Sequence, residues 1–239
     1  MNVVVDLGNT RAKTALFEGD VLIKKIAFDS IYELYKFLGS NLFENGIISS
    51  VSDSTRESLD NLTVTNKKFN LSTQLSLPIH IKYQTPETLG VDRIAAVCGA
   101  LSFFPKRDCL VIDAGTCINY EFLDANGNYL GGAISPGVEM RFKAMHTFTA
   151  RLPLIKPKAD VELTGTTTES CLQSGVMNGA LHEINGIIGR YLNKYPSLAV
   201  LLCGGDAPFF ENNLKPTIFA APDLVLMGLN RILSHNVSR

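Results

Sequence analysis

Two short turns carry residue types that can bind phosphate and metal ions. One reads Asp6-Leu7-Gly8-Asn9-Thr10 and the other Asp113-Ala114-Gly115-Thr116, and each follows a short apolar run. The carboxylate could hold a cation, the glycine permits a positive φ, and the hydroxyl and backbone N–H groups could hold phosphate oxygens. A single turn of this kind fits an ordinary hairpin equally well. Two copies at equivalent points of a repeat favour a nucleotide site.

A lysine follows the first turn on the predicted second strand. From this position the ammonium of Lys13 could reach the β- and γ-phosphates of a nucleotide as a point charge. The spacing fits a solvated strand lysine just as well.

A third acidic residue opens a predicted helix. Pro86 and Gly90 mark a loop, an apolar run begins at Ile94, and Asp92 and Arg93 therefore fall in the first helical turn. The helix dipole stabilises an aspartate there, which is a purely structural explanation. An arginine gains nothing from the dipole at that end, so it indicates an anionic partner. In a functional interpretation, Asp92 accepts a proton from an attacking hydroxyl and Arg93 binds a carboxylate.

Three further segments place glycine, proline or threonine at predicted strand–helix junctions, namely residues 131–138, 164–170 and 201–207. Small residues there allow a ligand to approach the backbone, and threonines before a helix are N-cap candidates. An ordinary structural role at the end of a strand and the start of a helix explains each segment equally well. No catalytic role is assigned to residues 131–138.

The elements that position these residues form an internal repeat. Each copy has a β-branched run ending in Asp-x-Gly, a second strand, a polar turn and a third strand, which covers Val21 to Phe28 in one copy and Tyr129 to Ser135 in the other. These local signals predict a three-stranded antiparallel meander used twice, with a helix after each copy.

The rest of the pattern predicts alternating α/β structure. We expect helices at 31–38, 56–62, 91–103, 138–148, 167–195, 207–212 and 224–234. We expect further strands near 46–51, 80–83, 198–203 and 217–219, with residues 153–160 as a connection.

Composition limits the classes of partner. The 239 residues are 46% hydrophobic and 19% charged, with 22 basic and 23 acidic residues, so nucleic acid is not expected as the main partner. The longest nearly apolar stretch, Ala95 to Phe104, is half of the roughly 20 residues that a membrane span needs, and the N-terminus does not resemble a signal peptide. We therefore expect a soluble, cytoplasmic protein.

The five scattered cysteines form no C-x-x-C pair, which argues against zinc or disulfides and suits a reducing compartment. Packing is the expected role of each cysteine. The histidines show no ligand spacing and are expected to be structural.

Taken together and in this order, the motifs resemble those of type III pantothenate kinases over essentially the whole chain. This resemblance places the chain in the actin/hexokinase/Hsp70 superfamily of acetate and sugar kinases, in which ATP lies between two RNase-H-like halves. It implies an α/β fold of duplicated RNase-H-like (actin-like ATPase) halves, each with a mixed sheet flanked by helices. The expected halves are residues 1–105 and 106–239.

The resemblance also implies an activity, the ATP-dependent phosphorylation of pantothenate to 4′-phosphopantothenate, which is the first step of coenzyme A biosynthesis. Asp92 corresponds to the proton acceptor of the family. The expected pantothenate site comprises Tyr83, Gly90, Val91, Asp92, Arg93 and Thr168. The expected ATP site comprises Asp6, Leu7, Gly8, Asn9, Thr10, Arg11, Ala12, Lys13 and Thr116.

The same resemblance implies cofactors and an assembly. Asp6 would help to hold Mg²⁺ through the ATP phosphates, and Asp113 would hold a monovalent cation, K⁺ or NH₄⁺. Family members are homodimers whose substrate site is completed at the interface. This chain departs from its relatives at two points, with Thr167-Thr168 where Asn-Thr is frequent and Cys117 where alanine is common.

Two alternatives remain open from the sequence. One is another small-molecule kinase of the same superfamily, acting on a sugar or acetate, which would keep the ATP site and change the acceptor site. The other is a non-catalytic regulatory protein like the Bvg accessory factor group. The four residues Asp6, Asp92, Arg93 and Asp113 argue against the second alternative, because a binding module needs no general base.

Overall fold

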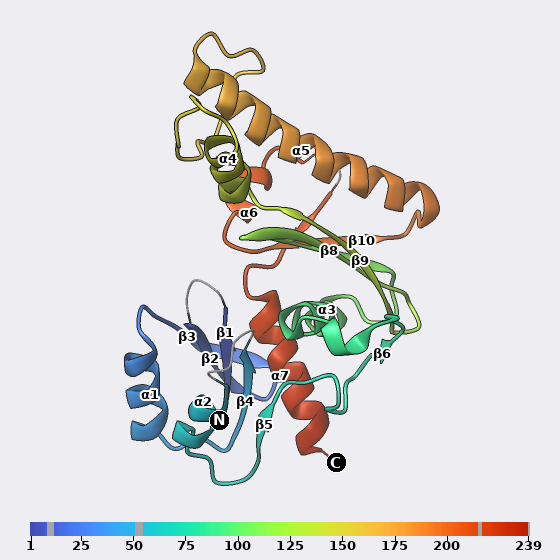
Figure 1. Cartoon of the computed structure of the whole chain (residues 1–239). Helices are drawn as coiled ribbons and strands as arrows, with labels where there is room; N and C mark the ends of the chain where they lie inside the picture. Colours follow the sequence, from blue (N-terminus) through green and yellow to red (C-terminus); the bar gives the residue numbers. More distant parts are fainter. Residues whose placement is uncertain (9–11, 51–54, 215–216, 239) are drawn as a thin grey trace. The chain divides into compact units, whose positions relative to one another are not determined.

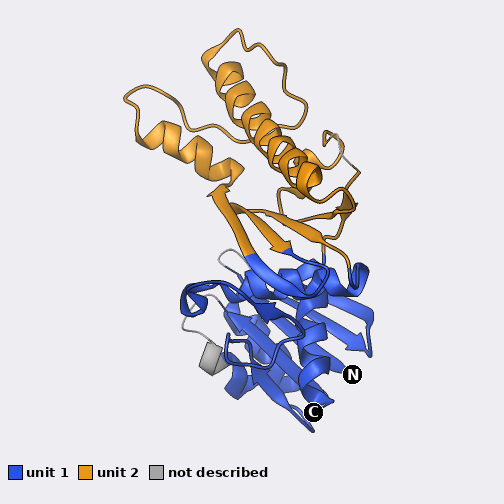
Figure 2. Ribbon diagram, turned by 90° about the vertical axis from the view of Figure 1, so that its right-hand side faces the viewer, with its two compact units in different colours: residues 1–106, 123–130, 223–239 blue, residues 107–122, 131–222 orange. Residues whose placement is uncertain are grey.

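The structure of the protein, a computed structural model, describes residues 1–8, 12–50, 55–214 and 217–238. It has two compact units (Figure 2): unit 1 contains residues 1–106, 123–130 and 223–239, and unit 2 contains residues 107–122 and 131–222. Unit 1 thus extends beyond the expected N-terminal half, 1–105, by a short central segment and the C-terminus. The division into halves at residues 105 and 106 stays a prediction.

The sheet of unit 1 starts with the predicted meander. Its strands are β1 (Asn2–Leu7), β2 (Ala12–Glu18), β3 (Val21–Phe28), β4 (Asn45–Ser50) and β5 (Lys68–Asn70), in the order β3-β2-β1-β4-β5. Antiparallel pairs join β1 to β2 and β2 to β3, whereas β4 runs parallel to β1 and to β5. The antiparallel meander predicted for the first copy is confirmed.

Successive side chains of β1 point to opposite faces of this sheet, and helices cover both faces. Val3, Val5 and Leu7 pack with residues of α1 (Ile31–Ser40) and α2 (Thr55–Asn61). On the other face, next to the fully buried Val4, lies α7 (Leu224–Val237), which also packs against α3 (Val91–Phe103). Figure 1 shows this layering of helices on both sides of β1. A sheet buried on both faces gives the strand ends of β1 a fixed framework.

The second sheet repeats the order of the first. Its strands are β7 (Cys109–Ala114), β8 (Cys117–Leu123), β9 (Asn128–Pro136), β10 (Ala199–Cys203) and β11 (Phe219–Ala220), with the short β6 (His80–Ile81) paired to residues 128–129 of β9. The full order is β11-β10-β7-β8-β9-β6. As β4 does with β1, β10 runs parallel to β7. The repeat read from the sequence is therefore a repeat of sheet topology.

Two helices cover one face of the unit 2 sheet. Their bounds are α4 (Val138–Thr147) and α5 (Thr168–Lys194), and the short α6 (Ala207–Phe210) follows β10. Leu110 and Ile112 of β7 pack with Phe142 of α4 and with Ile184 of α5. This shared core ties the second turn region to both helices.

Every predicted helix is present, with ends within two residues of the prediction except at the end of α7, which extends three residues further, to Val237. Sequence reasoning missed β5 and the 3₁₀ turn at Pro86–Thr88. It was also wrong about Cys171, which is exposed rather than packed, because it lines an open pocket at the start of α5. None of the described helices is both long and apolar enough to cross a membrane.

Candidate active site

The start of α3 in unit 1 holds the predicted acceptor-binding residues. Gly90 is the N-cap and Val91 the first helical residue, so Asp92 and Arg93 lie in the first turn as expected. Oδ1 of Asp92 accepts a hydrogen bond of 2.9 Å from the backbone N–H of Arg93. A Cβ added at Gly90 would lie 2.6 Å from that same oxygen. The glycine therefore leaves the space that the Asp92 carboxylate occupies.

Arg93 lies over an aromatic ring. The residue is only 8% exposed, and its Cζ lies 5.6 Å from the centroid of the Tyr83 ring. The Tyr83 ring in turn stacks on the buried Tyr129, with centroids 6.5 Å apart and planes 14° apart. A guanidinium stacked on an aromatic face can still donate from its edge to a planar anion. Tyr83 thus contacts Arg93, whereas the resemblance assigned it to the pantothenate site.

The first of the two predicted phosphate-binding turns, named the first phosphate turn below, begins with Asp6 at the end of β1. Asp6 is paired in register with Lys13 of β2 and Ser49 of β4, so all three lie on one face of the sheet. Leu7 is buried, Gly8 is exposed, and Ala12 starts β2. Asn9, Thr10 and Arg11 lie outside the described residues. The described part of the turn brings a carboxylate and an ammonium side chain to neighbouring strands.

Two buried hydroxyls near this turn were not predicted. Within the described ranges, Oγ1 of Thr14 and Oγ of Ser49 are buried and have no hydrogen-bond partner. Neither has a signal in the sequence, since serine and threonine are common in strands and their partners depend on packing.

The second phosphate turn lies in unit 2, between β7 and β8. It is closed by a hydrogen bond of 2.9 Å from the N–H of Gly115 to the carbonyl of Cys117. Asp113, the last residue but one of β7, is half-buried, and Thr116 is exposed. The exposure of Thr116 is compatible with its predicted role, which stays a prediction.

Backbone from two other segments contacts this turn directly. The N–H of Gly137 donates to the carbonyl of Thr116 at 3.1 Å, and a Cβ at Gly137 would collide with the carbonyl oxygens of Gly115 and Thr116. On another side, Gly204 has a φ of +95°, and a Cβ there would lie 2.5 Å from Oδ1 of Asp113. Within residues 131–138 and 201–207, Gly137 and Gly204 thus pack directly against the second phosphate turn.

Asp206 links these two segments. Its N–H donates to the carbonyl of Ala114 at 2.8 Å, and its carboxylate accepts a hydrogen bond from the backbone N–H of Val138. Burial, followed by the nearby charge of Glu139, raises the pKa of Asp206 above its ordinary value, and the bond from Val138 offsets part of that rise. Sequence reasoning gave Asp206 no role.

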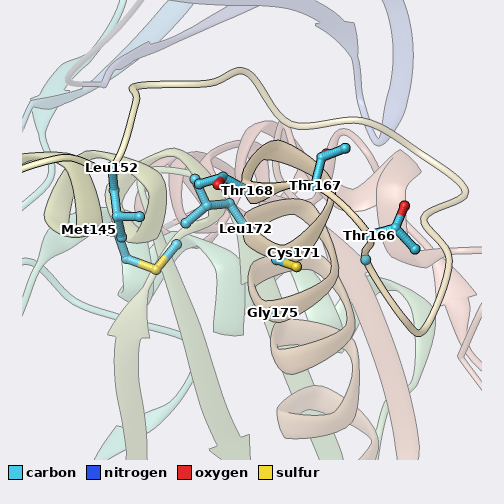
Figure 3. Close-up of a pocket in the computed structure, with 9 residues that line it drawn as sticks. Met145, Leu152, Thr166, Thr167, Thr168, Cys171, Leu172 and Gly175 are labelled. Atoms are coloured by element: carbon cyan, nitrogen blue, oxygen red, sulfur yellow. The ribbon is translucent and has the colours of Figure 1, made fainter.

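Thr168 begins α5, directly after its N-cap. The Thr167 hydroxyl accepts from the N–H of Ser170 at 3.1 Å in a capping box, so the predicted N-cap role belongs to Thr167 and Thr168 is exposed. Thr168 lines a pocket of about 500 Å³. Figure 3 shows Met145 and Leu152 on one side of this pocket and the first turns of α5 on the other. The pocket lining includes neither Asp113 nor Thr116.

The carboxylates of the two turns suit metal ions that also bind phosphate oxygens. Within the described ranges no three His, Cys, Asp or Glu side chains form a metal-binding group. Asp6 and Asp113 instead each offer carboxylate oxygens at a strand end. Mg²⁺ in kinases is typically held by one or two carboxylates together with substrate phosphates and water. The residues therefore fit a metal that enters with a nucleotide.

Comparison with known proteins gives a consistent result. A family model described as type III pantothenate kinase matches residues 2–190. A type III pantothenate kinase of Cytophaga hutchinsonii is 44% identical over 237 residues, which cover 99% of this chain and 100% of that protein. One of Bacteroides fragilis is 44% identical over 245 residues and covers 100% of both chains.

Solved structures support the fold. A Baf family protein from Campylobacter jejuni aligns with a TM-score of 0.66 at 23% identity, covering 99% of this chain and 100% of that one. A ROK family protein from Streptococcus pneumoniae aligns with a TM-score of 0.53 at 13% identity, covering 100% and 99%. At these identities the likeness concerns the fold alone, and it confirms the predicted duplicated α/β architecture.

Proposed function

The chain belongs to the type III pantothenate kinase family, and we propose that the predicted residues of both units carry out the family's reaction. The protein is a pantothenate kinase, a phosphotransferase that uses ATP and a divalent metal ion. Its product, 4′-phosphopantothenate, is the first intermediate on the route to coenzyme A.

In the reaction a pantothenate hydroxyl oxygen forms a bond to the γ-phosphorus of ATP. The bond from that phosphorus to the β–γ bridging oxygen breaks, and ADP leaves. The hydroxyl proton passes to a carboxylate, which we assign to Asp92. Phosphoryl transfer has a loose transition state, so positioning and neutralisation of charge contribute more than the strength of the base.

The acceptor side of the mechanism rests on the start of α3. Asp92 orients the hydroxyl and accepts its proton, while Arg93 binds the pantothenate carboxylate. Gly90 and Val91 line the same site, and Tyr83 supports the Arg93 guanidinium through the contact at 5.6 Å. Thr168 contributes a substrate contact from its pocket on α5.

The ATP side of the mechanism rests on the two phosphate turns. Asp6, Lys13 and Thr116 hold the triphosphate with backbone N–H groups of the turns. The remaining ATP contacts come from Leu7, Gly8, Asn9, Thr10, Arg11 and Ala12. Asp6 helps to hold Mg²⁺, which supplies neutralisation of charge on the phosphates. Asp113 holds K⁺ or NH₄⁺, a role supported by the half-buried position of this residue and by the Ala114 carbonyl oxygen, which lies beside Gly204 together with Oδ1 of Asp113.

We further propose a homodimer in the cytoplasm. Unit 2 leaves large apolar side chains exposed, among them Phe148 at 86% and Leu163 at 77%. Exposed apolar side chains mark an interface where they form one contiguous patch, which the proposed dimer would cover. Light scattering coupled to size exclusion would report a dimer if the proposal is correct, and a monomer at working enzyme concentrations would contradict it.

The observation that carries the catalytic assignment is the geometry at Asp92. This residue lies in the first turn of α3, and Gly90 leaves the space for its carboxylate. The next residue, Arg93, lies over the Tyr83 ring. The test is ADP release with pantothenate as acceptor, run with K⁺ and then with Na⁺. Wild type should release ADP only when pantothenate is present, and faster with K⁺.

In the same assay, Asp92→Asn should lower kcat by about 100- to 10,000-fold, as expected for loss of a general base. ATP binding should be retained. The exposed turn residue Asp20 provides the control, because Asp20→Asn also removes one carboxylate and should leave kcat unchanged. Near-normal turnover of Asp92→Asn would remove Asp92 from its role. Turnover with a sugar or acetate, and none with pantothenate, would favour the other kinases of the superfamily.

A further inference from the structure

One carboxylate in unit 2 gathers three hydrogen-bond donors from three different elements. Oε1 of Glu183, on α5, accepts from the Tyr120 hydroxyl of β8 at 2.8 Å and from the Ser135 hydroxyl of β9 at 2.6 Å. Oε2 of Glu183 accepts from Nη2 of Arg141, on α4, at 2.6 Å. Burial acts to raise the pKa of Glu183, but the donors together hold it below its ordinary value. The group is therefore an anchored anion.

Arg141 extends this anchor to the backbone. While its Nη2 contacts Glu183, its Nε donates to the carbonyl of Pro136 at 2.8 Å. Pro136 is the last residue of β9, and α4 starts two residues later. Because an arginine fork is planar and rigid, fixing one edge on a carboxylate fixes the direction of the other. The position of the Pro136 carbonyl therefore depends on Glu183.

The next residue is the one that contacts the second phosphate turn. The N–H of Gly137 donates to the carbonyl of Thr116, and the Gly137 Cα lies so close to Gly115 and Thr116 that a methyl group does not fit. A shift of the β9–α4 junction must therefore move the turn or break the hydrogen bond. This gives a continuous path of contacts from Glu183 to Thr116.

We propose that Glu183, acting through Arg141 and Pro136, is a positioning residue for ATP: it sets the place of the second phosphate turn. The inference rests on the proposed role of Thr116 in holding the triphosphate. A merely structural ion pair would stabilise unit 2 without a preference for one substrate, whereas a positioning role acts on ATP and spares pantothenate.

Two variants separate these roles. Glu183→Gln keeps an acceptor for Tyr120 and Ser135 but loses the charge that orients Arg141. Arg141→Lys keeps a charge for Glu183 but has no second edge to reach the Pro136 carbonyl. Both should raise the KM for ATP, and the Kd of a non-hydrolysable ATP analogue, by about tenfold. The KM for pantothenate at saturating ATP should stay within about twofold of wild type.

The matched control is Lys143→Ala, which removes a positive charge from the same helix, where Lys143 pairs only weakly with Glu139 at 3.6 Å. It should leave both KM values unchanged. Should Glu183→Gln fail to fold, Ser135→Ala gives the same readout, with an expected rise of about threefold in the KM for ATP. This variant removes one donor to Glu183 and also the hydroxyl that accepts a hydrogen bond of 3.1 Å from Nη2 of Arg141.

Unchanged ATP affinity in Arg141→Lys and Glu183→Gln, or an equal rise in both KM values, would overturn the positioning role. With those results, the wild-type enzyme would still bind ATP and phosphorylate pantothenate, so the proposed function would stand. If wild type itself binds no ATP analogue, it is the proposed function that fails, so the two failures are distinguishable.

Discussion

Gly90 in unit 1 and Gly137 in unit 2 both stand where a methyl group does not fit, but their neighbours differ. Beyond Gly90 lies a side-chain atom, Oδ1 of Asp92, whereas beyond Gly137 lie backbone carbonyls of Gly115 and Thr116. A carboxylate can rotate away from a methyl group, but a packed backbone cannot. The comparison indicates that the glycine of unit 1 leaves room for the Asp92 carboxylate, whereas the glycine of unit 2 lets two backbone segments pack directly together.

The largest effect is expected from the backbone contact. Gly137→Ala should destabilise the protein by about 3 kcal/mol, because the β9–α4 junction and the second turn must separate. ATP affinity should fall with it. Urea unfolding measures the loss of stability, and binding of an ATP analogue measures the loss of affinity. A Gly137→Ala variant as stable as wild type would contradict the claim that packed backbone leaves no room for a methyl group there.

Gly90→Ala should show the reverse pattern. The added methyl displaces the Asp92 carboxylate, and a misplacement of about 1 Å can reduce turnover by about 100-fold. The stability of the variant should change little, because the displaced atom belongs to a side chain. Steady-state kinetics with thermal unfolding tests this, and a large loss of stability with normal kcat would contradict it.

Tyr83→Leu tests whether the ring in contact with Arg93 supports the acceptor site of unit 1. Loss of the ring beneath Arg93 removes a cation–π contact of about 1 kcal/mol, so the KM for pantothenate should rise by about fivefold. The KM for ATP should not change. A variant in which only the KM for ATP rises would show that the ring does not serve the acceptor site.

Acid should weaken unit 2 through Glu183, with the smallest effect of the four. Because the folded-state pKa of Glu183 is depressed, its contribution to the free energy of unfolding is complete above its ordinary value of 4.5 and is lost as pH falls through the folded-state pKa. The stability gap between wild type and Glu183→Gln in urea should therefore be widest near neutral pH and shrink in acid. A gap that does not vary with pH would contradict the assignment.

Local sequence signals were enough for most of the fold. The Asp-x-Gly turns, the β-branched runs and the polar hairpins specified both meanders, and the equivalent orders β3-β2-β1-β4-β5 and β9-β8-β7-β10-β11 follow from the repeat. The helix start at Val91 was predicted from Gly90 and the apolar run that follows.

What could not be predicted depends on contacts between residues far apart in the chain. Glu183 and Arg141 are separated by 42 residues, and no spacing rule joins them. The stacking of Tyr83 on Tyr129 likewise requires the pairing of β6 with β9. Glycines at junctions signalled close approach, but not that the approaching group at Gly137 is protein backbone rather than a ligand.

The most direct test of the account is a crystal structure of the enzyme with a non-hydrolysable ATP analogue, Mg²⁺ and pantothenate. The account predicts the triphosphate in contact with both turns, at Lys13 and Thr116, and the Asp92 carboxylate about 3 Å from the primary hydroxyl of pantothenate. A complex in which that hydroxyl meets another base, or in which either turn has no phosphate contact, would contradict it.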